Sequence, residues 1–328
     1  MLGRARMVGF VVTLAIVAYG IWRLDLSKVG AALGAADYAL LPLSALATFC
    51  SYLVRTARWQ RILAPTARLP FRALYTPLMI GFMANNLLPA RMGEFVRAYS
   101  LRQTTGLSKT LGLSTVVLER VFDGLALVTI LALLASFGDL PAVGGTIAYA
   151  AGALFLLVAA GGWLLISNEA LALRLLRALT SPLPDALSDF AEARAQAFTS
   201  GLRALREPRT LAAIGLLSAL IWSCEALSYY LLMVGFHTAI GALTLPAAFF
   251  LTVVINLGIM IPSAPGYVGT FEGAGVTALT PFGVAPEASL ALTIVSHAVQ
   301  WLLVTAIGAA LMGRGGLSLR RLEAVERT

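Results

Sequence analysis

The stretch IGFMANNLLPARMGEFVR, residues 80–97, decides the fold. It begins as an apolar run suited to a membrane helix, but two amides, a proline, a glycine and three charges interrupt it. In hydrocarbon, broken backbone is tolerated only where it is buried in protein or lines a water-filled cavity. Charges inside a membrane usually mark a pathway. The stretch therefore predicts a discontinuous helix beside a polar site within a membrane.

A second stretch, NLGIMIPSAPGYVGTFE at residues 256–272, has the same pattern. Aligned on Pro89 and Pro265, both stretches read Pro-x-x-x-Gly-x-Phe, and each has a glutamate next to the phenylalanine. Matching interruptions in two halves of a membrane chain point to a transporter binding site. The alternative is that two breaks match by chance over seven positions.

The composition is that of a membrane protein. Of the 328 residues, 59% are hydrophobic and 12% are charged, and the mean hydropathy is +0.85. A soluble domain carries about 25% charged residues. The net charge of +8 comes almost entirely from arginine, and we expect it to follow the positive-inside rule rather than to bind nucleic acid. Cys50 and Cys224 both lie in apolar runs, so no disulfide is expected.

The apolar runs and their basic flanks predict six membrane crossings, with both termini in the cytoplasm. A crossing needs about 20 residues, so the run 74–88 and the pair 246–282 are expected to be re-entrant, each entering and leaving on one side. The alternative for 74–88 is a full crossing that violates the positive-inside rule. The runs are 8–22, 40–54, 74–88, 111–135, 147–166, 210–234, 246–262, 268–282 and 288–312.

Three segments outside the breaks have their own interpretations. The run 8–22 is expected to be a first membrane helix, and the alternative is a signal peptide cleaved within Ala31–Ala36. Residues 167–209 are rich in arginine and are predicted to be a cytoplasmic amphipathic segment on the membrane face. The helix 40–54 is expected to end before a cytoplasmic segment marked by Arg55, Arg58, Arg61, Arg68 and Arg72.

This topology predicts one integral membrane domain over residues 1–328, built from two inverted repeat halves. The halves are residues 40–135 and 210–312, and each consists of a helix, a re-entrant broken hairpin and a second helix. The fold class is therefore all-α, a polytopic membrane protein with six spanning helices and two broken hairpins. Inverted repeats whose discontinuous helices meet near the midplane are typical of transporters.

Ten polar side chains are candidate substrate-binding residues because they interrupt apolar segments. In the run 111–135, Glu119 and Asp123 share one helix face, and Arg120 can pair with Asp123. The structural alternative is a charge cluster that joins helices. Glu225 could titrate, or it could pair with Arg120 or Arg97 across the bundle. The candidates are Asn85, Asn86, Arg91, Glu94, Arg97, Glu119, Arg120, Asp123, Glu225 and Glu272.

Other residues are assigned to shaping the backbone or to the core. Asn85 and Asn86 are also expected to cap the broken helix or to bond the carbonyls that the break leaves free. Glu94 could pair with Arg97, and His297 is expected to be a core histidine. Catalytic residues, metal ligands and cofactors are not predicted, because no phosphate-binding loop, H-E-x-x-H, G-x-S-x-G or C-x-x-C occurs. The backbone-shaping residues are Pro89, Gly93, Pro262, Pro265, Gly266 and Gly269.

Three motifs give the chain a resemblance to a known family. They are N-N-L-L-P-A-R-M-G-E-F-V-R (Asn85–Arg97), L-E-R-V-F-D (Leu118–Asp123) and I-P-S-A-P-G-Y-V-G-T-F-E (Ile261–Glu272), with R-T-A-R-W (Arg55–Trp59) as a weaker fourth. The chain resembles the lysylphosphatidylglycerol synthase transmembrane-region family, which is described as flippase-like. Some members carry a soluble aminoacyl-transferase domain, which is not expected here, and others lie beside glycosyltransferases. The resemblance therefore implies lipid translocation or handling rather than aminoacyl transfer.

Three functions remain open at this point. The first is a flippase-like transporter in the inner (plasma) membrane for a phospholipid, an aminoacyl-phospholipid or a polyprenyl-phosphate glycolipid. The second is a membrane enzyme or subunit of lipid or glycolipid biosynthesis, with carboxylates as acid and base. The third is a lipid-binding organiser without transport. Membrane lipids are the expected partners in each case, together with a lipid synthase or glycosyltransferase.

Overall fold

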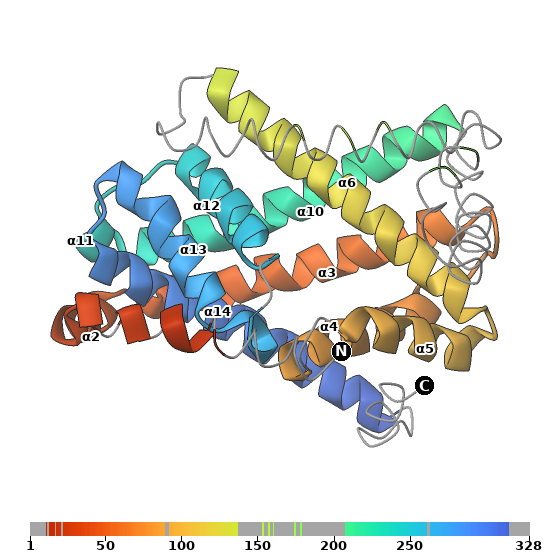
Figure 1. Ribbon diagram of the computed structural model, residues 1–328, viewed down its shortest axis with the longest axis horizontal. Coiled ribbons are helices and arrows are strands. Elements are labelled where there is room, and N and C mark those ends of the chain that lie inside the picture. The colour runs from red at the N-terminus through yellow and green to blue at the C-terminus, as the bar shows by residue number, and fades with distance from the viewer. Residues whose placement is uncertain are drawn as a thin grey trace.

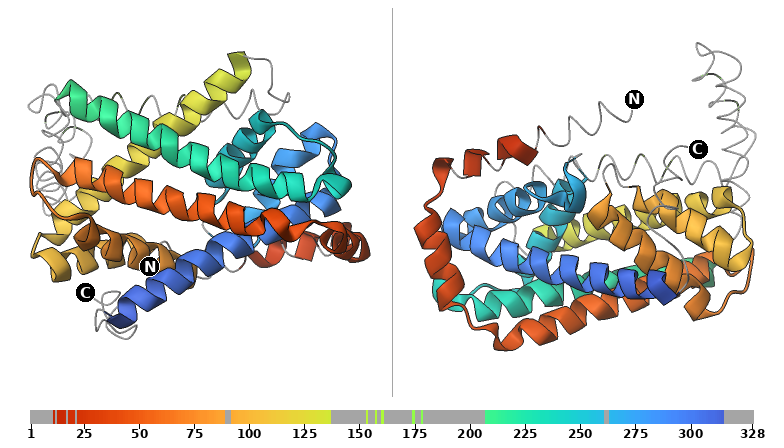
Figure 2. Two further views of the ribbon diagram at one scale, coloured as in Figure 1. Left: turned by 180° about the vertical axis from the view of Figure 1, so that it is seen from behind. Right: turned by 90° about the horizontal axis from the view of Figure 1, so that it is seen from below.

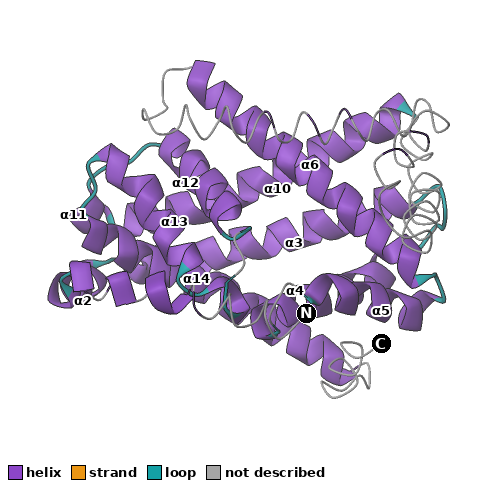
Figure 3. Cartoon of the chain, viewed as in Figure 1, coloured by secondary structure: helices purple, strands orange, loops and turns teal. Residues whose placement is uncertain are grey.

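The computed structural model describes residues 11, 13–16, 18–20, 22–88, 92–136, 153, 157, 160, 174, 178, 207–260 and 263–314. All regular elements in these ranges are helices, and none is a strand (Figure 3). The prediction of an all-α protein is therefore confirmed.

Four helices in the described ranges are longer than 20 residues: α3 (Leu41–Leu63), α6 (Lys109–Ser136), α10 (Pro208–Gly235) and α14 (Pro286–Arg314). The shorter α-helices are α2 (Leu26–Ala35), α4 (Phe71–Leu87), α5 (Gly93–Thr105), α11 (His237–Ile240), α12 (Leu245–Gly258) and α13 (Thr270–Leu279). Single 3₁₀ turns are η1 (Tyr38–Leu40), η3 (Pro265–Tyr267) and η4 (Thr280–Phe282).

Three helical segments of the described chain are long and apolar enough to cross a membrane. They are Tyr38–Leu63, Pro208–Gly235 and Pro286–Arg314. Helix α6 has 28 residues but carries three charges near its middle. The predicted crossing 8–22 is described only in part, and the crossing 147–166 and the amphipathic segment 167–209 lie largely outside the described residues. The count of six crossings stays a prediction.

Both predicted breaks occur where the sequence places them. Helix α4 ends at Leu87 and α5 begins at Gly93, while α12 ends at Gly258 and α13 begins at Thr270. Each pair of short helices packs together as a hairpin. Pro89, Arg91 and Pro262 lie outside the described residues.

Helix α3 corrects one sequence prediction. It does not end near residue 54 but continues to Leu63, so that Arg55, Arg58 and Arg61 are helical. Arg55 and Arg58 are buried, so they belong to the packed helix and not to a segment that follows it, while their placement on the cytoplasmic side stays a prediction. The helix continues because carboxylates on other helices neutralise the two guanidinium groups, as described below.

Among the described helices, α3 and α10 have the most extensive contact, and they run alongside each other through the molecule (Figure 2, left). Small hydroxyl side chains line the contact. The Ser228 hydroxyl lies 2.8 Å from both the Ser44 and the Thr48 hydroxyls, and Ser51 continues the row towards Glu225. Small residues let membrane helices approach closely, and their hydroxyls bond across the interface. This seam fixes α3 against α10 and so positions the charges that follow on both helices.

The two hairpins lie towards opposite ends of the long axis, with α12 and α13 at one end and α4 and α5 at the other (Figure 1). The α4 helix of one hairpin packs on α14, and the α12 helix of the other packs on α6. Glycines permit these contacts: a Cβ on Gly308 would lie 2.5 Å from the Met83 Cβ. Each hairpin therefore packs against a long helix from the other half of the chain.

Candidate functional site

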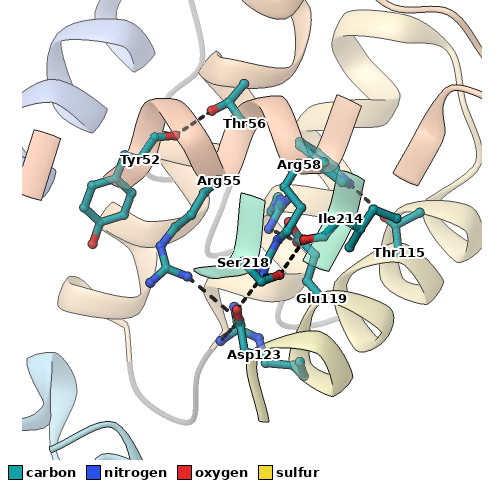
Figure 4. Close-up of polar contacts among 12 residues, drawn as sticks. Tyr52, Arg55, Thr56, Arg58, Thr115, Glu119, Asp123, Ile214 and Ser218 are labelled. Carbon is teal, nitrogen blue, oxygen red and sulfur yellow. Dashed lines mark hydrogen bonds and ion pairs between the residues drawn. The ribbon is translucent and has the colours of Figure 1, made fainter. Parts of the chain in front are cut away.

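A buried ion cluster lies where α3, α5, α6 and α10 converge. Arg55 and Arg58 are three residues apart on α3, and Glu119 and Asp123 are four apart on α6, so each pair shares one helix face. Figure 4 shows both α3 guanidinium groups pointing towards Asp123. The cluster is held by the packing of α3 against α10 and of α5 against α6.

The centre of the cluster is the pair of Arg58 and Asp123. The Arg58 Nη1 donates to Asp123 Oδ1 at 2.7 Å and to the Ser218 hydroxyl on α10 at 2.9 Å. The Arg58 side chain is only 1% exposed. A charge at this depth is tolerated only when it is paired and hydrogen-bonded. These contacts therefore tie three helices together.

A second buried pair joins α5 to α6. The Arg97 Nη1 lies 2.6 Å from Glu119 Oε2, and the Arg97 guanidinium carbon lies 3.6 Å from the centre of the Trp59 ring. Stacking of a desolvated guanidinium on tryptophan adds a cation–π attraction. Arg97 is 4% exposed and Glu119 is 1% exposed. This pair is packed into the protein and holds α5 in place.

The remaining pairs lie nearer to open space. Arg55 Nη2 donates to Glu225 Oε1 at 3.3 Å, and Arg120 lies 3.4 Å from Asp123 Oδ2 and 3.6 Å from Glu94 Oε1. Glu94 and Arg120 have 30% and 41% of their side chains exposed. The cluster therefore grades from a buried interior to an accessible edge.

The described cluster is electrically balanced. Its four guanidinium groups come from Arg55, Arg58, Arg97 and Arg120, and its four carboxylates come from Glu94, Glu119, Asp123 and Glu225. With every group ionised the net charge is zero. Removal of any one member would leave an uncompensated charge among apolar helices.

A polar cavity of about 110 Å³ opens beside this cluster. A single water needs about 10–15 Å³ on this measure, so the cavity has room for several waters or one small polar group. We call it the central cavity. Its walls combine charges, amides and aromatic rings: Tyr52, Arg55, Phe82, Asn85, Asn86, Glu94, Arg120, Trp222, Glu225, Tyr229, Ile255, Asn256, Ile259, Tyr267, Phe271, His297, Gln300, Trp301 and Val304.

Three buried donors of residues on this wall lack a hydrogen-bond partner among the described residues: Arg55 Nε, Arg120 Nε and Trp222 Nε1. The indole N–H of Trp222 is buried and has no hydrogen-bond acceptor among the described residues. Buried polar groups are nearly always paired, so an orphan donor beside a polar cavity indicates an acceptor on water or a ligand. Arg55, whose guanidinium carbon lies 5.0 Å from the Trp222 ring centre, adds a positive charge at the same place. This wall suits an anionic oxygen.

The two breaks meet at the central cavity. Gly266 has φ +71°, and a Cβ there would lie 2.9 Å from the Trp301 Nε1 and 3.2 Å from the Asn86 carbonyl oxygen. Only glycine permits this approach without strain. Asn86 also donates to the Thr305 hydroxyl on α14 at 3.0 Å. The second break is therefore packed directly against the end of α4.

The first break is closed by its own amide and glycine. The Asn85 Oδ1 accepts from the Gly93 N–H at 2.9 Å, which confirms the predicted capping role of Asn85. A Cβ on Gly93 would overlap the Gly81 carbonyl oxygen, so α5 folds back closely onto α4. The backbone of Gly93 therefore lies where a side chain would not fit.

Glu272 and His297 form a pair on the far side of the central cavity. The His297 Nδ1 lies 2.6 Å from Glu272 Oε1, while Glu272 Oε2 accepts from the Gly269 N–H at 2.7 Å. The second bond caps α13, since an acidic group three residues into a helix can bond back to the capping amide. Gly269 has φ +85° and Pro265 begins η3. His297 also stacks on Phe271, with ring centres 4.2 Å apart.

The structure separates the predicted binding residues into groups. Asn85, Asn86, Glu94, Arg120 and Glu225 line the central cavity. The other predicted residues are placed elsewhere: Arg97, Glu119 and Asp123 lie in the buried part of the cluster, Glu272 lies behind His297, and Arg91 is outside the described residues.

Two pairings differ from the prediction, and one agrees with it. Glu225 pairs with Arg55 rather than with Arg120 or Arg97, and Glu94 pairs with Arg120 rather than with Arg97. The predicted pair of Arg120 with Asp123 is present.

Sequence reasoning missed several residues of the site. Arg55 and Arg58 were not predicted as site residues because charged residues that follow an apolar run usually mark the end of a membrane helix. Trp222, Asn256 and Gln300 lie within apolar runs and give no local signal that they face a cavity. The weak motif R-T-A-R-W, which contains both missed arginines, was the one available signal.

Comparison with known proteins identifies the family. A family model described as the lysylphosphatidylglycerol synthase TM region matches residues 6–308. The chain belongs to this family. As a member of the lysylphosphatidylglycerol synthase TM family it is a membrane protein, in agreement with its apolar helices.

Relatives of this family member occur among archaeal proteins. This chain is 29% identical over 323 residues to the protein named glycosyltransferase AglD of Haloferax volcanii, and the match covers 89% of this chain and 51% of that protein. The chain therefore spans about half the length of this relative. A UPF0104 membrane protein of Methanothermobacter thermautotrophicus is 26% identical, covering 88% of this chain and 89% of that protein. Another UPF0104 membrane protein, from Methanocaldococcus jannaschii, is 25% identical over 69% of this chain and 91% of that protein.

Proposed function

We propose that this protein moves a lipid between membrane leaflets by holding the phosphate of the lipid headgroup in the central cavity. The observation that carries the proposal is a charged and hydrogen-bonding cavity bounded by two broken helices within an apolar bundle. A polar headgroup crossing hydrocarbon needs such partners, since each unsatisfied group costs several kcal/mol there. The hydrocarbon chains of the lipid stay in the bilayer.

The proposed substrate carries a phosphate together with an amine or a sugar. Arg55, Arg120 and the unpaired Trp222 N–H suit phosphate oxygens, because guanidinium groups bind them through paired charge-assisted bonds. Glu94 and Glu225 balance the charge and suit an ammonium or sugar hydroxyls. The candidates are a phospholipid, an aminoacyl-phospholipid and a polyprenyl-phosphate glycolipid. The name of the AglD relative supports the last of these.

In this proposal the protein lies in the plasma membrane with both termini in the cytoplasm, and residues 40–135 and 210–312 act as inverted halves. The matching order of helices supports the repeat: each half has a long helix, two short helices and a second long helix. The two hairpins, each packed on a long helix of the other half, would then alternate access to the central cavity. A lipid synthase or glycosyltransferase is the proposed partner that supplies the lipid.

The test is a leaflet-accessibility assay. The purified protein is reconstituted in vesicles with labelled phospholipids and a short labelled polyprenyl phosphate, and a membrane-impermeant quencher is added outside. Wild type is expected to make one lipid class fully quenchable. Glu225→Gln removes a charge-assisted bond worth about 1.5–3 kcal/mol, which corresponds to a rate about 10- to 140-fold lower. Glu207→Gln, an exposed position before α10, is the matched control and should keep the wild-type rate.

A second function has one observation in its favour, the name of the AglD relative. In this alternative Glu94 and Glu225 would act as acid and base on a lipid-linked sugar. Mass spectrometry of the lipids after incubation separates the two functions. An altered lipid mass would favour the enzyme, while unchanged lipids that have exchanged leaflets would favour the transporter.

A further inference from the structure

A second cavity, of about 720 Å³, lies between the N-terminal helical residues and the helices α13 and α14. We call it the lateral groove. Its walls are mostly apolar, with Ile16, Leu24, Val276, Leu290 and Ile294 among the lining residues. Ile294 is 39% exposed and lies on α14, which is long and apolar enough to cross a membrane. A groove with this lining offers few hydrogen-bonding partners and suits a hydrocarbon chain.

Specific contacts build one end of the groove. The Thr13 hydroxyl donates to the Val268 carbonyl oxygen at 3.1 Å and accepts from the Ala264 N–H at 2.9 Å. A Cβ on either Gly269 or Gly273 would lie 3.6 Å from Ile16. The N-terminal residues therefore dock onto the second break through backbone groups and small residues.

The other end of the groove has the side chains of a membrane–water interface. Arg23 lines the groove, and its guanidinium carbon lies 5.8 Å from the Tyr19 ring centre and 5.4 Å from that of Trp22. Tyrosine and tryptophan concentrate at the headgroup level of bilayers, and long basic side chains reach towards it. The groove thus extends from Arg23, where the side chains suit a membrane–water interface, to the second break.

The Glu272–His297 pair links the wall of the lateral groove to the wall of the central cavity. Glu272 lines the groove, while its partner His297 and the stacked Phe271 line the central cavity. The polar and apolar compartments are therefore neighbours, since hydrogen-bonded residues line both of them. An amphipathic ligand has a polar part that matches one compartment and an apolar part that matches the other.

We propose that the lateral groove binds one hydrocarbon chain of the lipid whose headgroup phosphate occupies the central cavity, and that the Glu272–His297 pair is the partition between the two. The inference rests on the proposed function, since it assigns the headgroup phosphate to the central cavity. It adds a chain-binding site and a lateral route at α13 and α14. The occupant is a membrane lipid, because the apolar groove begins at side chains that suit a membrane–water interface.

Photolabelling of the full chain tests the groove. The protein is reconstituted in vesicles of phosphatidylethanolamine and phosphatidylglycerol that contain a phosphatidylglycerol with a diazirine in one acyl chain. Peptide mass spectrometry should find the label concentrated on Val276, Leu290 and Ile294. Leu216, which is 72% exposed on α10, reports contact with bulk lipid. Equal labelling of Leu216 and the groove would mean bulk lipid only and would overturn the proposal.

Two variants sharpen the test of chain binding. Ile294→Trp fills the groove and should reduce the groove label to the level of Leu216, whereas Leu216→Trp should leave the groove label unchanged. Groove labelling in a protein that moves no lipid supports the chain site and overturns the transport proposal. Lipid movement unaffected by Ile294→Trp, together with uniform labelling, supports transport and overturns the chain site.

Labelling of Trp301 tests whether the Glu272–His297 pair separates the two compartments. Glu272→Ala removes the bond to His297 and should extend the chain label to Trp301 on the central-cavity side. Glu272→Gln can still bond to His297 and Gly269 and should keep the label out. Labelling of Trp301 in wild type as strong as in Glu272→Ala would show that the pair does not separate the compartments.

Discussion

Replacement of Asp123 by asparagine tests whether the buried cluster holds the helices together. Asp123 Oδ1 accepts from Arg58 at 2.7 Å, and Oδ2 lies 3.4 Å from Arg120 and 3.8 Å from Arg55. The neutral amide leaves four guanidinium groups facing three carboxylates, so the cluster gains a net charge of +1. Breaking a buried pair by removing one partner costs about 3–5 kcal/mol. We expect a loss of stability of that size.

The two native cysteines provide the assay. Cys50 on α3 and Cys224 on α10 are half-buried on the two helices that form the central seam. A fluorogenic maleimide will label them as the seam opens, so a denaturant titration in detergent follows the separation of α3 from α10. Asp123→Asn should lower the midpoint markedly, and Glu207→Gln should leave it unchanged.

A double variant separates charge from packing in the same assay. Replacing both partners, with Arg58→Met and Asp123→Leu, removes the pair without leaving one charge alone, and such replacements are often neutral or stabilising. We expect it to recover most of the stability lost in Asp123→Asn. An Asp123→Asn protein with the wild-type midpoint would refute the reasoning, because the cluster would then contribute nothing to helix packing.

The other predictions concern the first break and the stacked arginine. Gly93→Ala places a methyl group against the Gly81 carbonyl oxygen and the Asn85 side chain, so we expect a loss of about 1–3 kcal/mol from overpacking, measured by the same titration; an unchanged midpoint would contradict the close approach of α4 and α5. Arg97→Lys keeps the charge but loses the planar fork that stacks on Trp59. We expect a loss of about 1–2 kcal/mol, and full stability of the lysine variant would show that the stacking is unimportant.

The sequence predicts the breaks well because their signals are local. Each break combines proline and glycine with polar residues within a few positions, which favours a helix end, and Asn85 bonds to a residue only eight positions away. The pair of Arg120 with Asp123 is predictable for the same reason, since residues three apart on a helix are neighbours. The all-α fold class is also predictable, because it follows from the length and apolarity of the runs.

The site itself could be predicted only in part, because its contacts join distant segments. Arg58 meets Asp123 across 65 residues, and Arg55 meets Glu225 across 170. The positive-inside rule places such arginines outside the membrane unless their partners are known. Trp222 gives no local signal, since its orphan N–H becomes visible only when the central cavity has formed. Side-chain pairing across helices is a property of packing and not of periodicity.

The most direct test of the central claim is a structure of the protein by electron cryomicroscopy in nanodiscs that contain the lipid moved in the leaflet assay. The account predicts density for the headgroup phosphate in the central cavity, with an anionic oxygen near Arg55, Arg120 and the Trp222 indole N–H. Density for water alone in that cavity, with the headgroup phosphate bound elsewhere on the protein, would contradict the account.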